Sequence, residues 1–213
     1  MKDLEIRGAG NILGVNQHGV INVVGVSHFI RMLNQAVEDL QTGKTTEAAD
    51  QPQEVAVELP ISAYIPDFYI SNTKEKINAY QRMSSADTLD YLEELKEDIL
   101  EEFGKFPKEV LNLLRVIELK ILAKQAGLTV IKAENIHTKH GKQILLYMSA
   151  RVKPENIANL LSYNSHWEIT GSKLRIKTEY LGLQWIDELR ECIKKLGEKI
   201  DMPGKPKEVP TKT

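Results

Sequence analysis

Residues 87–128 read DTLDYLEELKEDILEEFGKFPKEVLNLLRVIELKILAKQAGL, and this stretch decides the fold. Large apolar residues recur every three or four positions from Leu89 to Phe103 and again from Val110 to Leu122, which is the period of one buried helix face. The stretch therefore predicts two consecutive amphipathic helices that pack on a shared core. Four residues mark the predicted helix starts and stops: Asp87, Gly104, Pro107 and Gly127.

The sequence on both sides adds strands and further helices. Upstream, Val55, Val57 and Leu59 alternate with other residues, which predicts a strand, and a helix is predicted to begin at Asn72. These elements and those downstream indicate the α+β class: a helical N-terminal arm and linker, then a compact domain of several helices plus short antiparallel β-hairpins. The downstream elements are strands at 128–136 and 142–149, a short helix from Pro154, a tight hairpin of 167–170 with 173–177, and a final helix carrying Leu183, Ile186, Leu189, Ile193, Leu196 and Ile200.

A polar stretch divides the chain into two parts. Residues 42–53 (TGKTTEAADQPQ) contain no large apolar side chain, so we predict a solvated linker there. The preceding residues 1–41 include a predicted helix after Ser27, but they are too few to build a stable core alone. The expected organisation is an arm at 1–41, a linker at 42–53, a C-terminal domain at 54–201 and a flexible tail rich in Pro and Lys at 202–213.

The composition is typical of a globular chain in a reducing compartment. The 28 Lys and Arg residues against 30 Asp and Glu give a net charge of −2, which leaves no overall basic field for nucleic acid. No apolar run approaches the roughly 18–20 residues that span a bilayer, and the first residues lack the apolar core of a secretory signal. The single cysteine, Cys192, cannot form an internal disulfide and is expected to be a part-buried structural thiol. We expect a cytoplasmic protein that does not contact a membrane.

Residue types that carry catalysis or bind a metal or nucleotide do not occur at the required spacings. Gly8, Gly10 and Gly14 are one residue too widely spaced for a dinucleotide-binding loop, and no Walker A sequence occurs. His137 and His140 form the one close histidine pair, but they fall in a predicted turn without a Cys or acidic partner at ligand spacing. We therefore expect no catalytic residue, no metal ligand and no cofactor in this chain.

The helix predicted after Asp87 is strongly acidic, and its C-terminal end carries negative charge where the helix dipole disfavours it. One interpretation is a solvated helix face; the other is a surface for a basic protein partner, because such a face would repel DNA phosphates. Asp98 and Glu101 lie three residues apart and so share one face. The acidic residues are Asp87, Asp90, Glu93, Glu94, Glu97, Asp98, Glu101 and Glu102, opposed by Lys96. The candidate protein-interaction residues are Asp98, Glu101 and Glu102.

Residues 2–19 read KDLEIRGAGNILGVNQHG, a more specific pattern than any above. It closely resembles the translocation motif, D-L-E-I-R-G-x-G-x-x-L-G-x-x-Q-x-G, of the RecG-like DNA translocases and the transcription-repair coupling factors. The rest of the chain resembles the coupling factors, and the resemblance covers nearly its whole length. The defining motif positions are Asp3, Leu4, Glu5, Ile6, Arg7, Gly8, Gly10, Leu13, Gly14, Gln17 and Gly19, and the later matches are a V-x-V-E-L-P strand, Ile65-Pro66-Asp67, Tyr80-Gln81-Arg82 and Glu102-Phe103-Gly104.

The resemblance implies the C-terminal part of a bacterial superfamily 2 DNA translocase. Such a protein would use ATP and Mg²⁺ to move on double-stranded DNA, displace stalled RNA polymerase and recruit the damage-recognition protein of excision repair. Residues 1–41 would be the tail of its second motor lobe, and the C-terminal domain would mask its repair-recruiting module. Since the nucleotide-binding lobe would lie upstream, we expect this chain alone not to be an enzyme. Glu102 stands where some relatives carry an arginine.

The motif's residue types suit the coupling role that the resemblance implies. Glycines let the backbone turn tightly and approach a neighbouring lobe, while Arg7 and Gln17 supply donors that can respond to a phosphate or to a helix shift. An alternative is a free-standing, non-catalytic adaptor that binds a basic protein partner through the acidic helix. The residues assigned to coupling of ATP hydrolysis to translocation are Arg7, Gly8, Gly10, Gly14 and Gln17.

Overall fold

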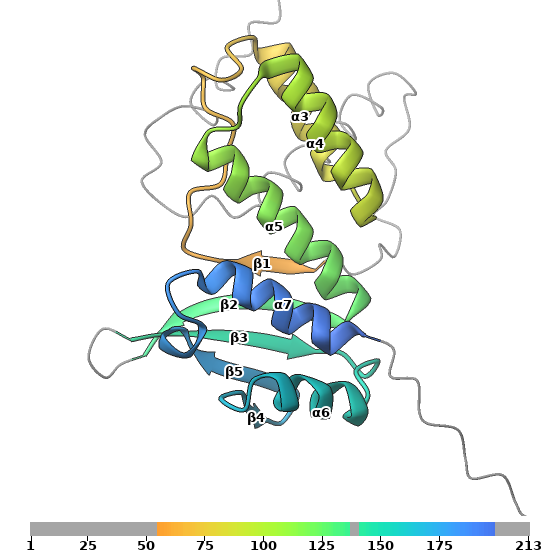
Figure 1. Cartoon of the computed structure of the whole chain (residues 1–213), viewed down its shortest axis with the longest axis vertical. Coiled ribbons are helices and arrows are strands. Elements are labelled where there is room, and N and C mark those ends of the chain that lie inside the picture. Colours follow the sequence, from red (N-terminus) through yellow and green to blue (C-terminus); the bar gives the residue numbers. More distant parts are fainter. Residues whose placement is uncertain (1–54, 137–140, 199–213) are drawn as a thin grey trace, which may run out of the picture.

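The structure, a computed structural model, describes residues 55–136 and 141–198 (Figure 1). Within these residues, helices and strands form an α+β fold, as the sequence predicts. The elements in chain order, with the labels of Figure 1, are β1 (Ala56–Glu58), α3 (Thr73–Ser84), α4 (Leu89–Phe103), α5 (Lys108–Gln125), β2 (Leu128–Asn135), β3 (Lys142–Met148), α6 (Pro154–Tyr163), β4 (Glu168–Thr170), β5 (Lys173–Lys177), the 3-10 helix η1 (Thr178–Leu181) and α7 (Trp185–Gly197).

The strands form one sheet in the order β1-β2-β3-β5-β4. β1 runs parallel to β2, and the other neighbours are antiparallel. One cross-strand row consists of Val57, Ile131, Leu146 and Leu174, which are all buried. The predicted hairpins are therefore present, but they are not separate units, because shared apolar burial joins them and the isolated strand β1 into a single sheet.

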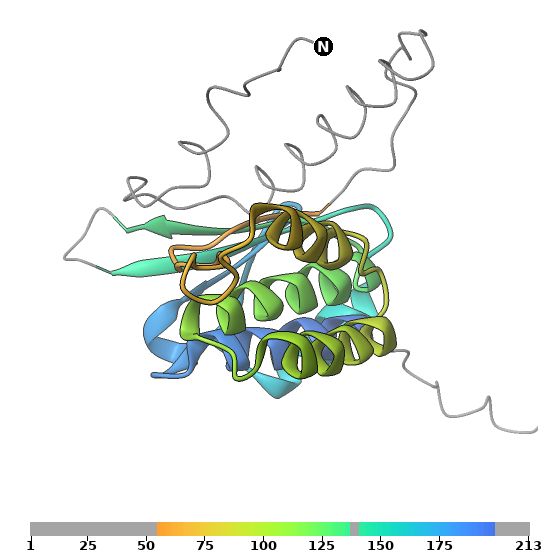
Figure 2. The ribbon, with the colours of Figure 1, turned by 90° about the horizontal axis from the view of Figure 1, so that it is seen from above.

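Helices α5 and α7 lie on one face of this sheet. Figure 2 shows the strands with α5 and α7 on the same side, and α6 packs against α7. α3 and α4 lie side by side at the end of the domain farthest from β4 and α6 (Figure 1). α5 is central, since it contacts β1, β2, α3, α4 and α7. Its buried residues accordingly extend around the helix: Val110, Asn112, Leu113, Leu114, Val116, Ile117, Leu119, Ile121, Leu122 and Ala123.

The starts of α3, α4, α5 and α6 agree with the sequence to within one residue. Asn72 caps α3, as predicted, because its side-chain oxygen accepts the backbone N–H of Lys74 at 2.9 Å. The predicted cap Asp87 is wrong by one position: the hydroxyl of Thr88 accepts the N–H of Tyr91 at 3.3 Å. Asp and Thr are both common N-cap residues, so two adjacent candidates could not be distinguished from the sequence. Pro107 precedes the first turn of α5 instead of lying inside it.

Two apolar residues that fall within the predicted helices are exposed. Leu183 precedes α7 and is fully exposed, because η1 and Gly182, at φ +73°, redirect the chain before the helix begins at Trp185. Leu100 lies on α4 but is 45% exposed, since it falls outside the stripe that faces the core. The final residue of the predicted helix pattern, Ile200, lies outside the described residues.

The predicted division of the chain stays a prediction. The described residues fall within the expected domain at 54–201, whereas the arm at 1–41, the linker at 42–53 and the tail at 202–213 lie outside them. The predicted turn with His137 and His140 also lies outside them.

Candidate functional site

The acidic helix α4 buries one stripe against the domain. Leu92, Leu95 and Ile99 are at most 2% exposed. Thr88 caps the first turn, and Gly104, at φ +80°, ends the helix with its N–H bonded to the carbonyl of Leu100. Because a helix turns by about 100° per residue, these contacts fix which acidic residues point toward neighbours and which point to solvent.

Two of the three predicted interaction residues point toward α3. Asp98 pairs with Nη2 of Arg82, and the carboxylate of Glu102 lies 3.4 Å from Nη1 of the same arginine. Arg82 belongs to the last turn of α3, where a cation also interacts favourably with the helix dipole. The arginine therefore neutralises part of the charge at the C-terminal half of α4 and joins the two helices.

The third predicted residue, Glu101, belongs to a different face. Asp90, Glu94, Glu97 and Glu101 are spaced by four, three and four residues, so they form one stripe opposite the buried residues. All four are exposed, and none has an ion-pair partner within the described ranges 55–136 and 141–198. We call these four residues the outer acidic stripe. It is the part of α4 whose charge remains available to another molecule.

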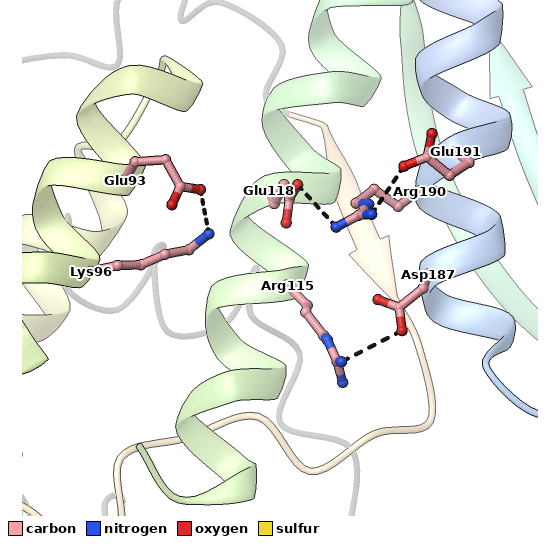
Figure 3. Close-up of polar contacts among 7 residues, drawn as sticks. All are labelled: Glu93, Lys96, Arg115, Glu118, Asp187, Arg190 and Glu191. Atoms are coloured by element: carbon pink, nitrogen blue, oxygen red, sulfur yellow. Dashed lines mark hydrogen bonds and ion pairs between the residues drawn. The ribbon is translucent and has the colours of Figure 1, made fainter. Parts of the chain in front are cut away.

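The remaining edge of α4 carries the helix's one basic residue. Nζ of Lys96 lies 2.6 Å from the carboxylate of Glu93, a pair within one helix turn (Figure 3). Exposed pairs of this kind contribute only about 0.2–1 kcal/mol to stability. The main effect of this pair is on how charge is distributed around the helix. The cation of Lys96 offsets Glu93 and leaves the outer acidic stripe unopposed.

Ion pairs also connect α5 with α7 (Figure 3). The guanidinium of Arg115 lies 3.5 Å from Asp187, and that of Arg190 lies 3.7 Å from Glu118 and 3.0 Å from Glu191. Burial alone would lower the pKa of Arg190, but the charges of Glu118 and Glu191 hold it above its usual value. Two of these pairs, Arg115 with Asp187 and Arg190 with Glu118, add contacts between α5 and α7.

Sequence reasoning found the acidic helix but missed Arg82. The one available signal was its place in the last turn of a predicted helix, and that does not reveal which residue of the next helix lies beside it. The residues assigned to coupling, Arg7, Gly8, Gly10, Gly14 and Gln17, lie outside the described residues, and their role stays a prediction.

Cys192 is fully buried on α7, as a structural thiol. Burial raises the pKa of this thiol, which keeps it protonated and unreactive. In the part of the chain that the structure describes, no three His, Cys, Asp or Glu side chains form a group that could hold a metal ion. Likewise, none of the described helices is both long enough and apolar enough to cross a bilayer.

Fold and site together define an α+β domain that presents an acidic helix face to solvent. Residues 59–157 match the TRCF domain. The transcription-repair-coupling factor of Staphylococcus aureus (strain USA300) is 32% identical over 208 residues, which are 94% of this chain and 17% of that protein. That of Staphylococcus haemolyticus (strain JCSC1435) is 35% identical over 200 residues, or 91% and 16%. This chain belongs to the family of the transcription-repair-coupling factors, as their C-terminal part.

The fold agrees with this assignment. A crystal structure of the C-terminal domain of a transcription-repair coupling factor is similar with a TM-score of 0.54 and 20% sequence identity. The similarity covers 68% of this chain and 94% of that one. The chain spans about a sixth of the length of the relatives it matches, so what such a whole protein does is a matter of proposal for this chain.

Proposed function

We propose that this chain is the C-terminal part of an ATP-dependent DNA translocase that displaces stalled RNA polymerase and couples transcription to nucleotide excision repair. In that protein, the domain containing α4 would mask the module that recruits the damage-recognition protein. The outer acidic stripe is the single observation that supports masking best, because its four carboxylates are exposed and lack ion-pair partners within the described residues. A basic surface on the masked module would complement them.

The residues proposed to contact the masked module are not the same as those predicted from the sequence. Glu101 is in both sets, and Glu97, which lies on the same stripe, is added. Asp98 and Glu102 would act mainly through Arg82, since they already pair with it. Contacts of this kind are worth about 1–3 kcal/mol, which changes the ratio of masked to open protein about 5- to 150-fold. That is sufficient for a switch that motor movement can release.

The test of masking is removal of the domain from the full-length protein. Deleting residues 54–213 should increase the affinity for the damage-recognition protein, as measured by calorimetric titration. If the affinity is unchanged, masking is wrong. Binding of a basic protein by the isolated 213-residue chain would then favour the alternative, a free-standing adaptor, because the same acidic stripe would be its binding surface.

Residues 3–19 would couple ATP hydrolysis to movement along double-stranded DNA. This part of the proposal rests on the motif, whose defining positions are all present in the sequence. ATP and Mg²⁺ are assigned to no residue of this chain, and the chain alone is proposed to be non-catalytic. In the full-length protein, Arg7→Ala or Gln17→Ala should leave ATP hydrolysis largely intact but strongly reduce translocation, whereas Asn16→Ala, at a variable motif position, should preserve both. Equal loss of both activities in the Arg7 and Gln17 variants would make these residues catalytic instead.

A further inference from the structure

Phe68 is the most exposed of the described aromatic side chains, at 80%. It lies at the tip of a turn between β1 and α3, in which the carbonyl of Pro66 accepts the N–H groups of Tyr69 at 3.0 Å and Ile70 at 3.1 Å. An isolated exposed apolar residue is ordinary. This one differs because the backbone on both sides of it is held in place.

The N-terminal side of the turn is anchored on α3. The N–H of Ile65 donates a buried hydrogen bond of 2.8 Å to the hydroxyl of Tyr80. Asp67, directly before Phe68, pairs with Lys76, whose side chain is only 5% exposed. A buried ammonium needs such a partner, so the position of Asp67 is tightly determined.

The C-terminal side of the turn is anchored on the end of α4. The hydroxyl of Tyr69 donates to the carbonyl of Gly104 at 2.9 Å, and its ring lies 6.1 Å from that of Phe103 and 6.5 Å from that of Phe106. Ile70 is 2% exposed. The residues around Phe68 are therefore fixed by contacts with the domain, while Phe68 itself points away from them.

Rigid presentation of an aromatic side chain has a known energetic consequence. Aromatic anchors that fill a pocket on a partner contribute most of the binding energy at many interfaces. When the anchor is already held in its bound conformation, less conformational entropy is lost on binding. The turn at 65–70 meets this condition because contacts with two different helices hold it.

The charges around the turn indicate what kind of partner fits. Its contact with Gly104 places Phe68 beside the C-terminal end of α4, and Asp67 is itself largely exposed. Of the four acidic side chains among residues 97–105, Glu97 and Glu101 have no ion-pair partner within the described residues, and the one basic residue there is Lys105. A partner at this place must therefore offer positive charge next to an apolar pocket.

We propose that Phe68 is an aromatic anchor that inserts into an apolar pocket rimmed by basic side chains on a protein partner. This inference rests on the proposed function, in which the partner is the repair-recruiting module of the same full-length protein. In such a complex Phe68 fills the pocket, and carboxylates of α4 face basic side chains of the same partner.

Photo-cross-linking in the full-length protein tests this contact directly. Benzoylphenylalanine replaces Phe68 in one variant and Tyr163, which is 45% exposed on α6, in the control. We expect the variant at position 68 to form an adduct with a segment of the same protein that lies upstream of this chain and contains Lys or Arg. The control variant should not form this adduct. Adducts formed only between two copies of the protein, or no adduct above the control level, would overturn the proposal.

Binding measurements separate this inference from the proposed function. Phe68→Ser should increase the affinity of the full-length protein for the damage-recognition protein about 30-fold, the effect of losing one anchor. The isolated chain should keep its Tm, because Phe68 is exposed. If Phe68→Ser has no effect while deletion of 54–213 does, the anchor is wrong and masking stands. If the deletion has no effect but position 68 still cross-links to the upstream segment, Phe68 is an anchor for that segment, and the contact does not mask the repair-recruiting module.

Discussion

Arg82 in the last turn of α3 pairs with Asp98 in the middle of α4, and the carboxylate of Glu102 lies 3.4 Å from the same guanidinium. This contact divides the acidic residues of α4 into two sets with different roles. The set beside Arg82 holds the two helices together, whereas the outer acidic stripe faces solvent. The proposed function depends on this division.

The Arg82–Asp98 pair should show measurable coupling in a double-mutant cycle. We expect Arg82→Ala and Asp98→Ala to couple by about 0.5–1 kcal/mol in urea unfolding, near the upper end for exposed pairs because Arg82 is only 29% exposed. The cycle for Glu93 and Lys96 should give a smaller coupling, about 0.3–0.5 kcal/mol. Both should weaken in 1 M salt. Zero coupling for Arg82 and Asp98 at low salt would show that the pair does not connect the helices.

Lys76 and Asp67 should respond differently to mutation. Lys76→Met keeps most of the buried volume and removes the charge, so we expect stability to be unchanged or higher. Asp67→Ala leaves the buried ammonium without its carboxylate and should cost about 1–3 kcal/mol. Thermal and urea unfolding of both variants measure the difference. Equal destabilisation by the two would mean that the aliphatic packing of Lys76 matters more than its charge.

Gly127 should tolerate alanine less well than Gly171 does. Both have a positive φ, +78° and +58°, at which an L-residue costs about 1–2 kcal/mol. A Cβ at Gly127 would also lie 3.3 Å from side-chain atoms of Arg151 and Val152, whereas a Cβ at Gly171 would meet nothing within 4 Å. Gly127→Ala should therefore lower the Tm more than Gly171→Ala. The opposite order would contradict the packing between the end of α5 and the segment after β3.

The raised pKa of Cys192 should make stability fall in mild alkali. The thiol ionises near pH 8.5 in the unfolded chain but stays protonated in the fold. Above that pH the unfolded state binds fewer protons, so the free energy of unfolding falls as pH rises. Urea unfolding between pH 7 and 9.5 should show this slope, and Cys192→Ala should reduce it. An identical slope in the variant would rule out the thiol as its cause.

The sequence predicts those features that depend on neighbours along the chain. α4 follows from the spacing of Leu92, Leu95 and Ile99, and α5 follows from the same spacing of apolar residues between Val110 and Leu122. Asn72 caps α3 as expected. The parallel pairing of Val57 with Ile131 could not be predicted, since three helices separate the two strands and nothing local specifies the partner. Non-local pairing of this kind is decided by burial in the assembled core.

The candidate site could be predicted only in part, for the same reason. The spacing of Asp98 and Glu101 shows that they lie on the same broad side of a helix, but a separation of three residues still turns them about 60° apart. Whether one of them meets a cation depends on how α3 packs beside α4. The proposed role of Phe68 likewise rests on contacts of Asp67 and Tyr69 with two helices, which leave no periodic signal in the sequence.

The measurement that tests the central claim most directly is a calorimetric titration of the excision-repair damage-recognition protein against the full-length coupling factor. Glu97→Lys with Glu101→Lys reverses the outer acidic stripe without disturbing Arg82, whereas reversal of Asp98 would also break that contact. Glu155→Lys with Glu179→Lys makes the same charge change on exposed residues outside α4. The stripe variant is predicted to bind about 5- to 150-fold more tightly than the wild type, and the control variant to bind equally to it. Equal affinity for all three proteins would contradict the claim that α4 masks the repair-recruiting module.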